Sequence, residues 1–132
     1  MMVRHPQVTE WESRLKALFD RIDVELEERY GGTYPLHPAR ARRGTTSNHE
    51  TDGLFNIGAA FTAGFGSQHG RGYVVSVRMA TLADVPDNIR ETIREAVVAR
   101  LEVLLPEAFP ERDLRVERDG DIYKIVGDLS VR

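Results

Sequence analysis

The residues best suited to bind a ligand lie in a basic segment without acidic side chains. Between Glu28 and Glu50 the chain has no Asp or Glu, but it has these basic and histidine residues: Arg29, His37, Arg40, Arg42, Arg43 and His49. Arginine can bind a phosphate through two parallel hydrogen bonds, and nearby tyrosines can stack on a base or sugar. We therefore predict that Arg40, Arg42 and Arg43 contact a phosphate-bearing ligand or nucleic acid. The plainer interpretation is a mobile loop that only keeps the chain soluble.

A second candidate is the glycine-rich segment 64–72, in which His69 and Arg71 stand between glycines. Successive glycines can turn backbone N–H groups toward an anion, and Arg71 adds a side-chain donor. The spacing is neither a Walker A loop nor a dinucleotide-binding fingerprint, because the chain has no Gly-Lys-Ser/Thr and no helix follows the glycines directly. We predict His69 and Arg71 as further ligand contacts. The alternative is that the glycines only permit a wide turn.

Histidines and carboxylates could in principle form a metal site. The candidate ligands are His37, His49, Glu50, Asp52 and His69. They lack the His-Glu-x-x-His spacing that puts two ligands on one face of a helix. Ser67 could act as a nucleophile, but no elbow motif surrounds it. We therefore assign no catalytic residue, no metal and no cofactor.

Length and composition exclude several other classes of protein. At 132 residues, 41% hydrophobic and 30% charged, the chain suits one globular domain over residues 1–132. It has no cysteine, which excludes disulfides and thiolate metal sites. The net charge of −3 gives no general attraction to nucleic acid or membranes, and no apolar run approaches the roughly 20 residues of a membrane span. We expect a cytoplasmic protein with no membrane partner.

The N-terminal third predicts a helix and then a long loop. Thr9 and Glu12 form a capping-box pattern, and the apolar residues that follow recur every three or four positions. The helix is expected to end at Gly31-Gly32, with its charged face, including Asp23, solvated. Residues 33–52 lose the hydrophobic period and contain Pro, Gly, Ser and Thr, which predicts a loop of unusual length.

The remaining segments predict a hairpin, a helix and a second hairpin. Bulky and small residues alternate over residues 54–82 on both sides of the glycine-rich segment, which is typical of paired strands. Between Pro86 and Pro106 apolar residues return to helical spacing, and Pro106 is expected to close that helix. Later in the chain, residues 114–118 and 122–131 flank an Asp-Gly pair.

The Asp119-Gly120 pair is the strongest turn signal in the chain. We predict a type I′ turn, which needs positive φ at both central residues and would pair Arg118 with Asp121. This register places Arg115 opposite Lys124. The two like charges would disfavour that pairing unless neighbouring residues compensate.

The order αββαββ predicts an α+β fold. We expect a two-layer sandwich in which both helices pack on one face of a mainly antiparallel four-stranded sheet. The opposite face of the first hairpin carries small residues: Asn56, Gly58, Ala60 and Thr62. Homodimerisation through this small face is the preferred hypothesis, and a plain solvated sheet is the alternative.

Together these features predict a small binding domain rather than an enzyme. We expect it to form a homodimer and to bind its ligand through the long loop and the hairpin tip. The competing function is a hydrolase or transferase acting on a phosphorylated metabolite, with His49 or His69 as acid or base. A third function is a purely structural dimerisation module. The enzyme requires the histidines, a carboxylate and the arginines to converge in one cleft.

Overall fold

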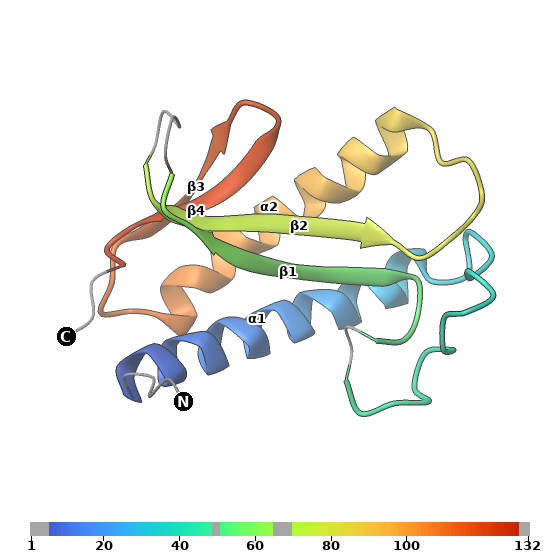
Figure 1. The fold of residues 1–132 in the computed structure, drawn as a ribbon, viewed down its shortest axis with the longest axis horizontal. Helices are drawn as coiled ribbons and strands as arrows, with labels where there is room; N and C mark the ends of the chain where they lie inside the picture. Colours follow the sequence, from blue (N-terminus) through green and yellow to red (C-terminus); the bar gives the residue numbers. More distant parts are fainter. Residues whose placement is uncertain (1–5, 49–50, 65–69, 130–132) are drawn as a thin grey trace.

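The computed structural model describes residues 6–48, 51–64 and 70–129, which form two helices and one four-stranded sheet (Figure 1). In chain order the elements are α1 (Pro6–Tyr30), β1 (Phe55–Thr62), β2 (Gly72–Met79), α2 (Asp87–Ala108), β3 (Leu114–Asp119) and β4 (Ile122–Gly127). The predicted order αββαββ and the α+β class are thereby confirmed. Neither described helix is long and apolar enough to cross a membrane.

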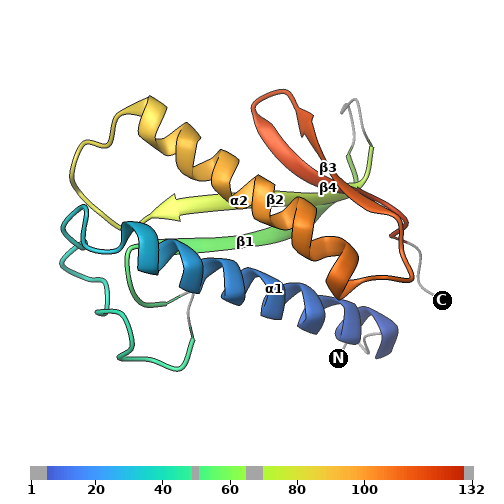
Figure 2. The ribbon, with the colours of Figure 1, turned by 180° about the vertical axis from the view of Figure 1, so that it is seen from behind.

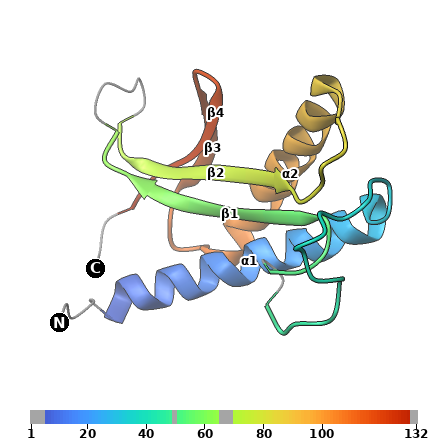
Figure 3. The same cartoon turned by 45° about the vertical axis from the view of Figure 1, so that its right-hand side comes forward.

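The sheet is antiparallel throughout, with the strand order β1-β2-β4-β3. The long first hairpin pairs without interruption from Phe55 opposite Met79 to Thr62 opposite Gly72. The contact between β2 and β4 is shorter, and Figure 3 shows the β3–β4 hairpin rising steeply away from the first hairpin. β1 and β3 are therefore the two edges of the sheet.

Both helices cover the same face of the sheet, and the core lies between the two layers (Figure 2). Helical spacing explains the contribution of α1, because every buried apolar residue of this helix lies on one stripe. The core side chains from both layers include Trp11, Leu15, Phe19, Ile22, Phe55, Ile57, Ile93, Leu101, Leu105, Phe109 and Ile125. Neither helix of the described residues lies over the opposite face of the first hairpin, so the small residues on that face are available for contact (Figure 1).

Both helices extend beyond their predicted limits. α1 begins at Pro6 rather than after Thr9, because proline is well suited to the first turn, where its missing N–H costs nothing. α2 continues through Pro106 to Ala108, and Phe109 donates its N–H to the carbonyl of Leu105. A proline in the last turn removes only one hydrogen bond, which the packing of Phe109 into the core can offset.

The predicted register of the second hairpin is wrong. Arg118 pairs with Tyr123, so the two-residue turn is Gly120-Asp121 and not Asp119-Gly120. Gly120 has a φ of +63°, and no non-glycine residue in the described ranges has positive φ. A turn with positive φ at its first central residue alone is of type II′, which accepts glycine there and places no demand on Asp121.

The corrected register also changes the environment of Lys124. This lysine lies opposite Glu117 rather than Arg115, and it is 1% exposed. Its Nζ donates to Oδ2 of Asp119 and to the carbonyl of Gly70, both at 2.8 Å. The ammonium is therefore buried with partners, as a buried charge requires, and it ties the second hairpin to the segment that leads into β2.

Candidate functional site

Residues 31–48, the part of the basic segment after α1 that the structure describes, lie in a loop, and Arg40 holds the base of this loop. The Arg40 Nε donates to the carbonyl of Gly53 at 3.0 Å, and Nη2 donates to those of Asp52 at 3.1 Å and Phe55 at 3.0 Å. One planar guanidinium thus binds three carbonyls where the loop enters β1. Arg40 uses these donors inside the protein, so they are not directed at a ligand.

Arg43 bridges the loop to α1 through two buried carboxylates. Its Nη1 lies 2.6 Å from Oδ1 of Asp23 and 3.2 Å from Oδ1 of Asp52. The other oxygen of Asp52 accepts hydrogen bonds from the N–H of Gly44 at 3.0 Å and of Thr46 at 3.2 Å. Burial by itself would raise the pKa of Asp52, but these hydrogen bonds and the Arg43 charge together lower it.

Asp23 is predicted to lie on the solvated face of α1, but it is buried. It is 1% exposed, and burial raises the pKa of its carboxyl to about 7, against the opposing effect of Arg43. Glu27 and Asp20 raise it further. Helical spacing contained the signal, because Asp23 lies four residues after Phe19 in the core stripe. A carboxyl that titrates near neutrality beside a guanidinium can act as an acid or base.

The other predicted contacts lie at two separate ends of the molecule. Arg42 is exposed in the loop and Arg71 is exposed beside the hairpin tip, whereas His69 lies outside the described residues. The loop leads into the first residue of β1 and the tip follows its last residue (Figure 1). Eight strand residues span about 26 Å, so the structure does not bring Arg42 and Arg71 together in one surface.

The proposed histidine chemistry falls mostly on residues that the structure does not describe. His49, Glu50 and Ser67 lie outside the described ranges, as His69 does. Within those ranges no group of three or more His, Asp or Glu side chains is placed to hold a metal ion. His37 lies within the described ranges, and its Nδ1 accepts a hydrogen bond from the N–H of Ala39 at 3.0 Å.

Glu27 of α1 and Arg40 of the loop together cap the beginning of the free edge of β1. Glu27 accepts the N–H groups of Leu54 at 2.5 Å and Phe55 at 3.1 Å, and Arg40 donates to the Phe55 carbonyl. Both backbone groups of Phe55 therefore point away from β2. This role of Glu27 was not predicted, because a carboxylate on the charged face of a helix gives no signal of its backbone partner in the sequence.

Strand alternation extends this geometry along β1. In an antiparallel pair every second residue turns both its N–H and its C=O away from the partner strand, so Ile57, Ala59 and Phe61 repeat the orientation of Phe55. Ile57 is 1% exposed, Ala59 is half-buried and Phe61 is 59% exposed. No partner outside the sheet reaches Ala59 or Phe61 among the described residues. The accessible edge of β1 therefore begins at Ala59.

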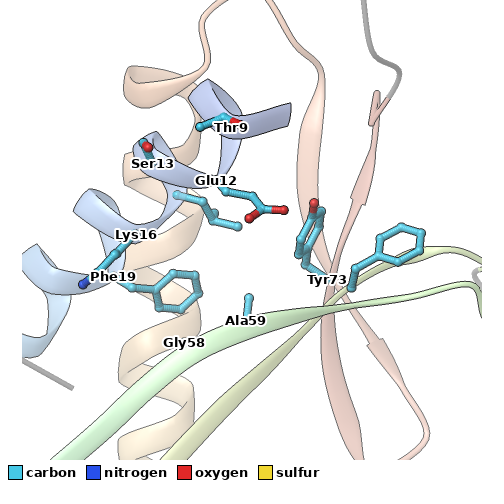
Figure 4. Close-up of a pocket in the computed structure, with 10 residues that line it drawn as sticks. Thr9, Glu12, Ser13, Lys16, Phe19, Gly58, Ala59 and Tyr73 are labelled. Atoms are coloured by element: carbon cyan, nitrogen blue, oxygen red, sulfur yellow. The ribbon is translucent and has the colours of Figure 1, made fainter. Parts of the chain in front are cut away.

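A groove of about 420 Å³ lies beside this edge, between β1 and the first half of α1 (Figure 4). Tyr73 and Phe61 form one wall, with their rings 5.7 Å apart at 70°, and Trp11 packs behind Tyr73 at 5.6 Å. From α1 the groove is bordered by Glu12, whose carboxylate points toward Tyr73 in Figure 4, and by Lys16. The groove thus combines an aromatic wall, main-chain groups and two opposite charges.

A protein family described as "Uncharacterised protein" matches residues 6–127, which include both helices and all four strands. The chain belongs to this family. An "Uncharacterized protein" of Borreliella burgdorferi is 37% identical over 106 residues, which cover 80% of this chain and 83% of the relative. No solved structure matches the chain. The aligned family region includes the edge of β1 and the groove beside it.

The two edges of the sheet differ in how well they are protected. β1, with the sequence FNIGAAFT, has no charged residue and no proline. The other edge strand, β3, has four charged residues in six: Arg115, Glu117, Arg118 and Asp119. Proteins commonly place charges on edge strands to prevent pairing with other chains. The uncharged edge of β1 lacks that protection and is the better candidate for a binding site.

Proposed function

We propose that this protein is a non-catalytic interaction domain that binds an extended polypeptide segment along the exposed edge of β1. The observation that carries the proposal is the outward orientation of the backbone groups of Ala59 and Phe61 beside an aromatic groove. An added strand would pair with these groups, and its side chains would enter the groove against Tyr73. Recognition of this kind needs no charged motif, which fits a strand without charges.

A synthetic peptide with the sequence of residues 54–64 is a direct probe of the edge. We expect it to slow hydrogen exchange at the N–H groups of Ala59 and Phe61. Exchange at Ala60 serves as an internal control, because its N–H faces β2 in the folded chain. A fully N-methylated version of the peptide keeps the side chains but lacks the donors, so it should give no protection. Protection elsewhere, or equal binding of both peptides, would contradict the proposal.

The enzyme alternative is supported by a different observation, the buried carboxyl of Asp23. Its pKa of about 7 is suited to proton transfer, and Arg43 lies beside it and also lines a pocket of about 580 Å³. Asp23 would replace the histidines as acid or base on a phosphorylated small molecule. A phosphatase assay with p-nitrophenyl phosphate tests it, since Asp23→Asn should abolish any turnover while the fold persists.

Binding of a phosphate-bearing ligand or nucleic acid through the loop has narrower support. Of the three predicted loop arginines, Arg42 is exposed, whereas Arg40 and Arg43 donate inside the protein. A short single-stranded RNA tests this function, because a phosphate contact by Arg42 should weaken with salt and be lost in Arg42→Glu. Binding that is unchanged in this variant would remove the loop from consideration.

A further inference from the structure

We propose that the segment bound at the edge of β1 is β1 of a second copy of this chain. This inference rests on the proposed function and names its partner. Two copies would pair their β1 strands antiparallel about a two-fold axis, so that two four-stranded sheets join into one sheet of eight strands. The same strip of surface then serves on both sides of the contact, as a two-fold interface requires.

The position of the axis follows from which part of the edge is open. Phe55 is capped by Glu27 and Arg40, and Ile57 is buried, so pairing begins at Ala59. The chain is exposed from Ala60 to Ala63, apart from the half-buried Thr62. A symmetric pairing of residues 59–63 is centred on Phe61. Ala59 of one copy then lies opposite Ala63 of the other.

The residues around this axis are compatible with a copy of themselves. Identical charges near a two-fold axis would face each other and repel, but β1 has none. Gly58, Ala59 and Ala60 let a second backbone come close. Phe61 is a large apolar side chain that is 59% exposed in the single chain, and pairing would cover it with its counterpart.

Charged residues of α1 also favour a second copy of the chain as the partner. α1 runs alongside β1 in Figures 1, 2 and 3, on the helical side of the sheet. A two-fold axis at the β1 edge brings the first halves of two α1 helices together in opposite directions. Glu12 and Lys16 border the groove one turn apart, and Lys16 also pairs with Asp20 of its own helix at 3.1 Å. The acid of one copy would therefore approach the lysine of the other beside that pair. A self-interaction uses both signs, whereas an acidic or basic peptide would use one.

Face-to-face stacking of the two sheets is the alternative arrangement, since the small face has no helix over it. The two arrangements depend on different side chains. Phe61 lies at the edge, whereas Ser76 lies on the interior strand β2 and points to the small face, opposite Gly58. The single variants Phe61→Lys and Ser76→Lys therefore distinguish the two arrangements.

Sedimentation equilibrium of the full chain, with circular dichroism to verify folding, tests the inference. We expect a dimer whose dissociation constant rises at least tenfold in Phe61→Lys and in Phe61→Glu. Mixing these two variants should restore a one-to-one dimer, because opposite charges then meet at the axis. Leu82→Lys is the matched control, as Leu82 is 73% exposed but lies outside β1, and it should leave the dimer unchanged.

Three results would overturn the inference. One is a dimer that Ser76→Lys dissociates and Phe61→Lys does not. Another is a dimer that neither variant weakens. The third is a wild-type chain that stays monomeric at all concentrations. In that monomer, protection of Ala59 and Phe61 by the synthetic peptide would leave the proposed function standing with another partner. No protection in the monomer would remove the proposed function as well.

Discussion

Nη1 of Arg43 lies 2.6 Å from Oδ1 of Asp23, so one ion pair joins the basic loop to the buried face of α1. The positive charge of the loop, which suggested a phosphate ligand, is in part the counter-charge of two buried carboxylates. Removing Arg43 would leave the carboxylates of Asp23 and Asp52 without their counter-charge, which costs more than the pairs contribute. Substitutions in this cluster should therefore affect stability before they affect any ligand.

Asp23→Asn should stabilise the protein at alkaline pH. The pKa of Asp23 is raised from 3.8 to about 7, so the folded protein holds this proton more tightly than the unfolded chain does. The contribution of Asp23 to stability is therefore full below pH 3.8, and it declines as the pH rises toward 7. Above pH 7 the variant should be more stable than the wild type by about 2–4 kcal/mol, since one pKa unit corresponds to about 1.4 kcal/mol.

Urea unfolding from pH 4 to pH 9 measures this difference. Asp20→Asn is the control, because Asp20 lies on the same helix in a surface pair with Lys16 and should change stability by less than about 0.5 kcal/mol. Equal pH profiles for wild type and Asp23→Asn would show that the Asp23 carboxyl is not held protonated by burial.

Asp52→Asn should destabilise the protein, with the opposite dependence on pH. Hydrogen bonds from Gly44 and Thr46 hold the pKa of Asp52 below 3.8, so its contribution is present above that value and is lost as the pH falls through the folded value. At pH 7 the free energy of unfolding of Asp52→Asn should be about 2–4 kcal/mol lower than that of the wild type, because Arg43 and two N–H donors lose a charged acceptor. Thermal unfolding at pH 7 and pH 3 should show the gap closing at the lower pH.

The element order was predictable because hydrophobic periodicity is local, and both helices and all four strands follow from it. The turn between β3 and β4 was not, because Asp119-Gly120 and Gly120-Asp121 both supply the required glycine. Only pairing with the rest of the sheet selects Arg118 opposite Tyr123. That choice also places Lys124 opposite Glu117 instead of Arg115.

The candidate site was harder to predict than the fold for a related reason. Arg40, Arg42 and Arg43 are alike in sequence, and their different roles depend on carbonyls and carboxylates far along the chain. Asp23 carried a helical signal, but a charged residue is assigned to the surface unless its counter-charge is known. The open edge of β1 could not be located before the strand order was known, since the sequence does not show which strands are at the edges.

Arginine substitutions in the loop should divide into two classes. Arg40→Ala should lower the free energy of unfolding by about 2–3 kcal/mol, because the carbonyls of Gly53 and Phe55 lose a charged donor. Arg40→Lys should recover little of this free energy, because an ammonium lacks the planar fork of the guanidinium. Arg42→Ala should change stability by less than about 0.5 kcal/mol, since Arg42 is exposed. Chemical denaturation of the three variants measures this. A similar cost at both positions would mean that Arg40 does not hold the base of the loop.

Two glycines in the first hairpin offer a matched test of the close contact between β2 and β4. A Cβ at Gly72 would lie 2.6 Å from the carbonyl oxygen of Ile125 and 2.7 Å from the side chain of Lys124, whereas nothing lies within 4 Å of a Cβ at Gly58. Gly72→Ala should therefore lower the free energy of unfolding by about 1–3 kcal/mol, the usual range for overpacking a well-packed site. Gly58→Ala should be neutral or stabilise by up to about 1 kcal/mol, because alanine loses less conformational entropy in a strand.

Denaturant unfolding of both variants distinguishes steric crowding from a general sensitivity of the hairpin. Crowding at Gly72 should also push Lys124 away from Asp119, so the amide signals of β4 and the second hairpin should shift in Gly72→Ala and stay in place in Gly58→Ala. An alanine at position 72 that costs nothing would mean that β2 and β4 can separate slightly without loss. The buried lysine would then depend less on the close approach of the two strands than its two 2.8 Å hydrogen bonds imply.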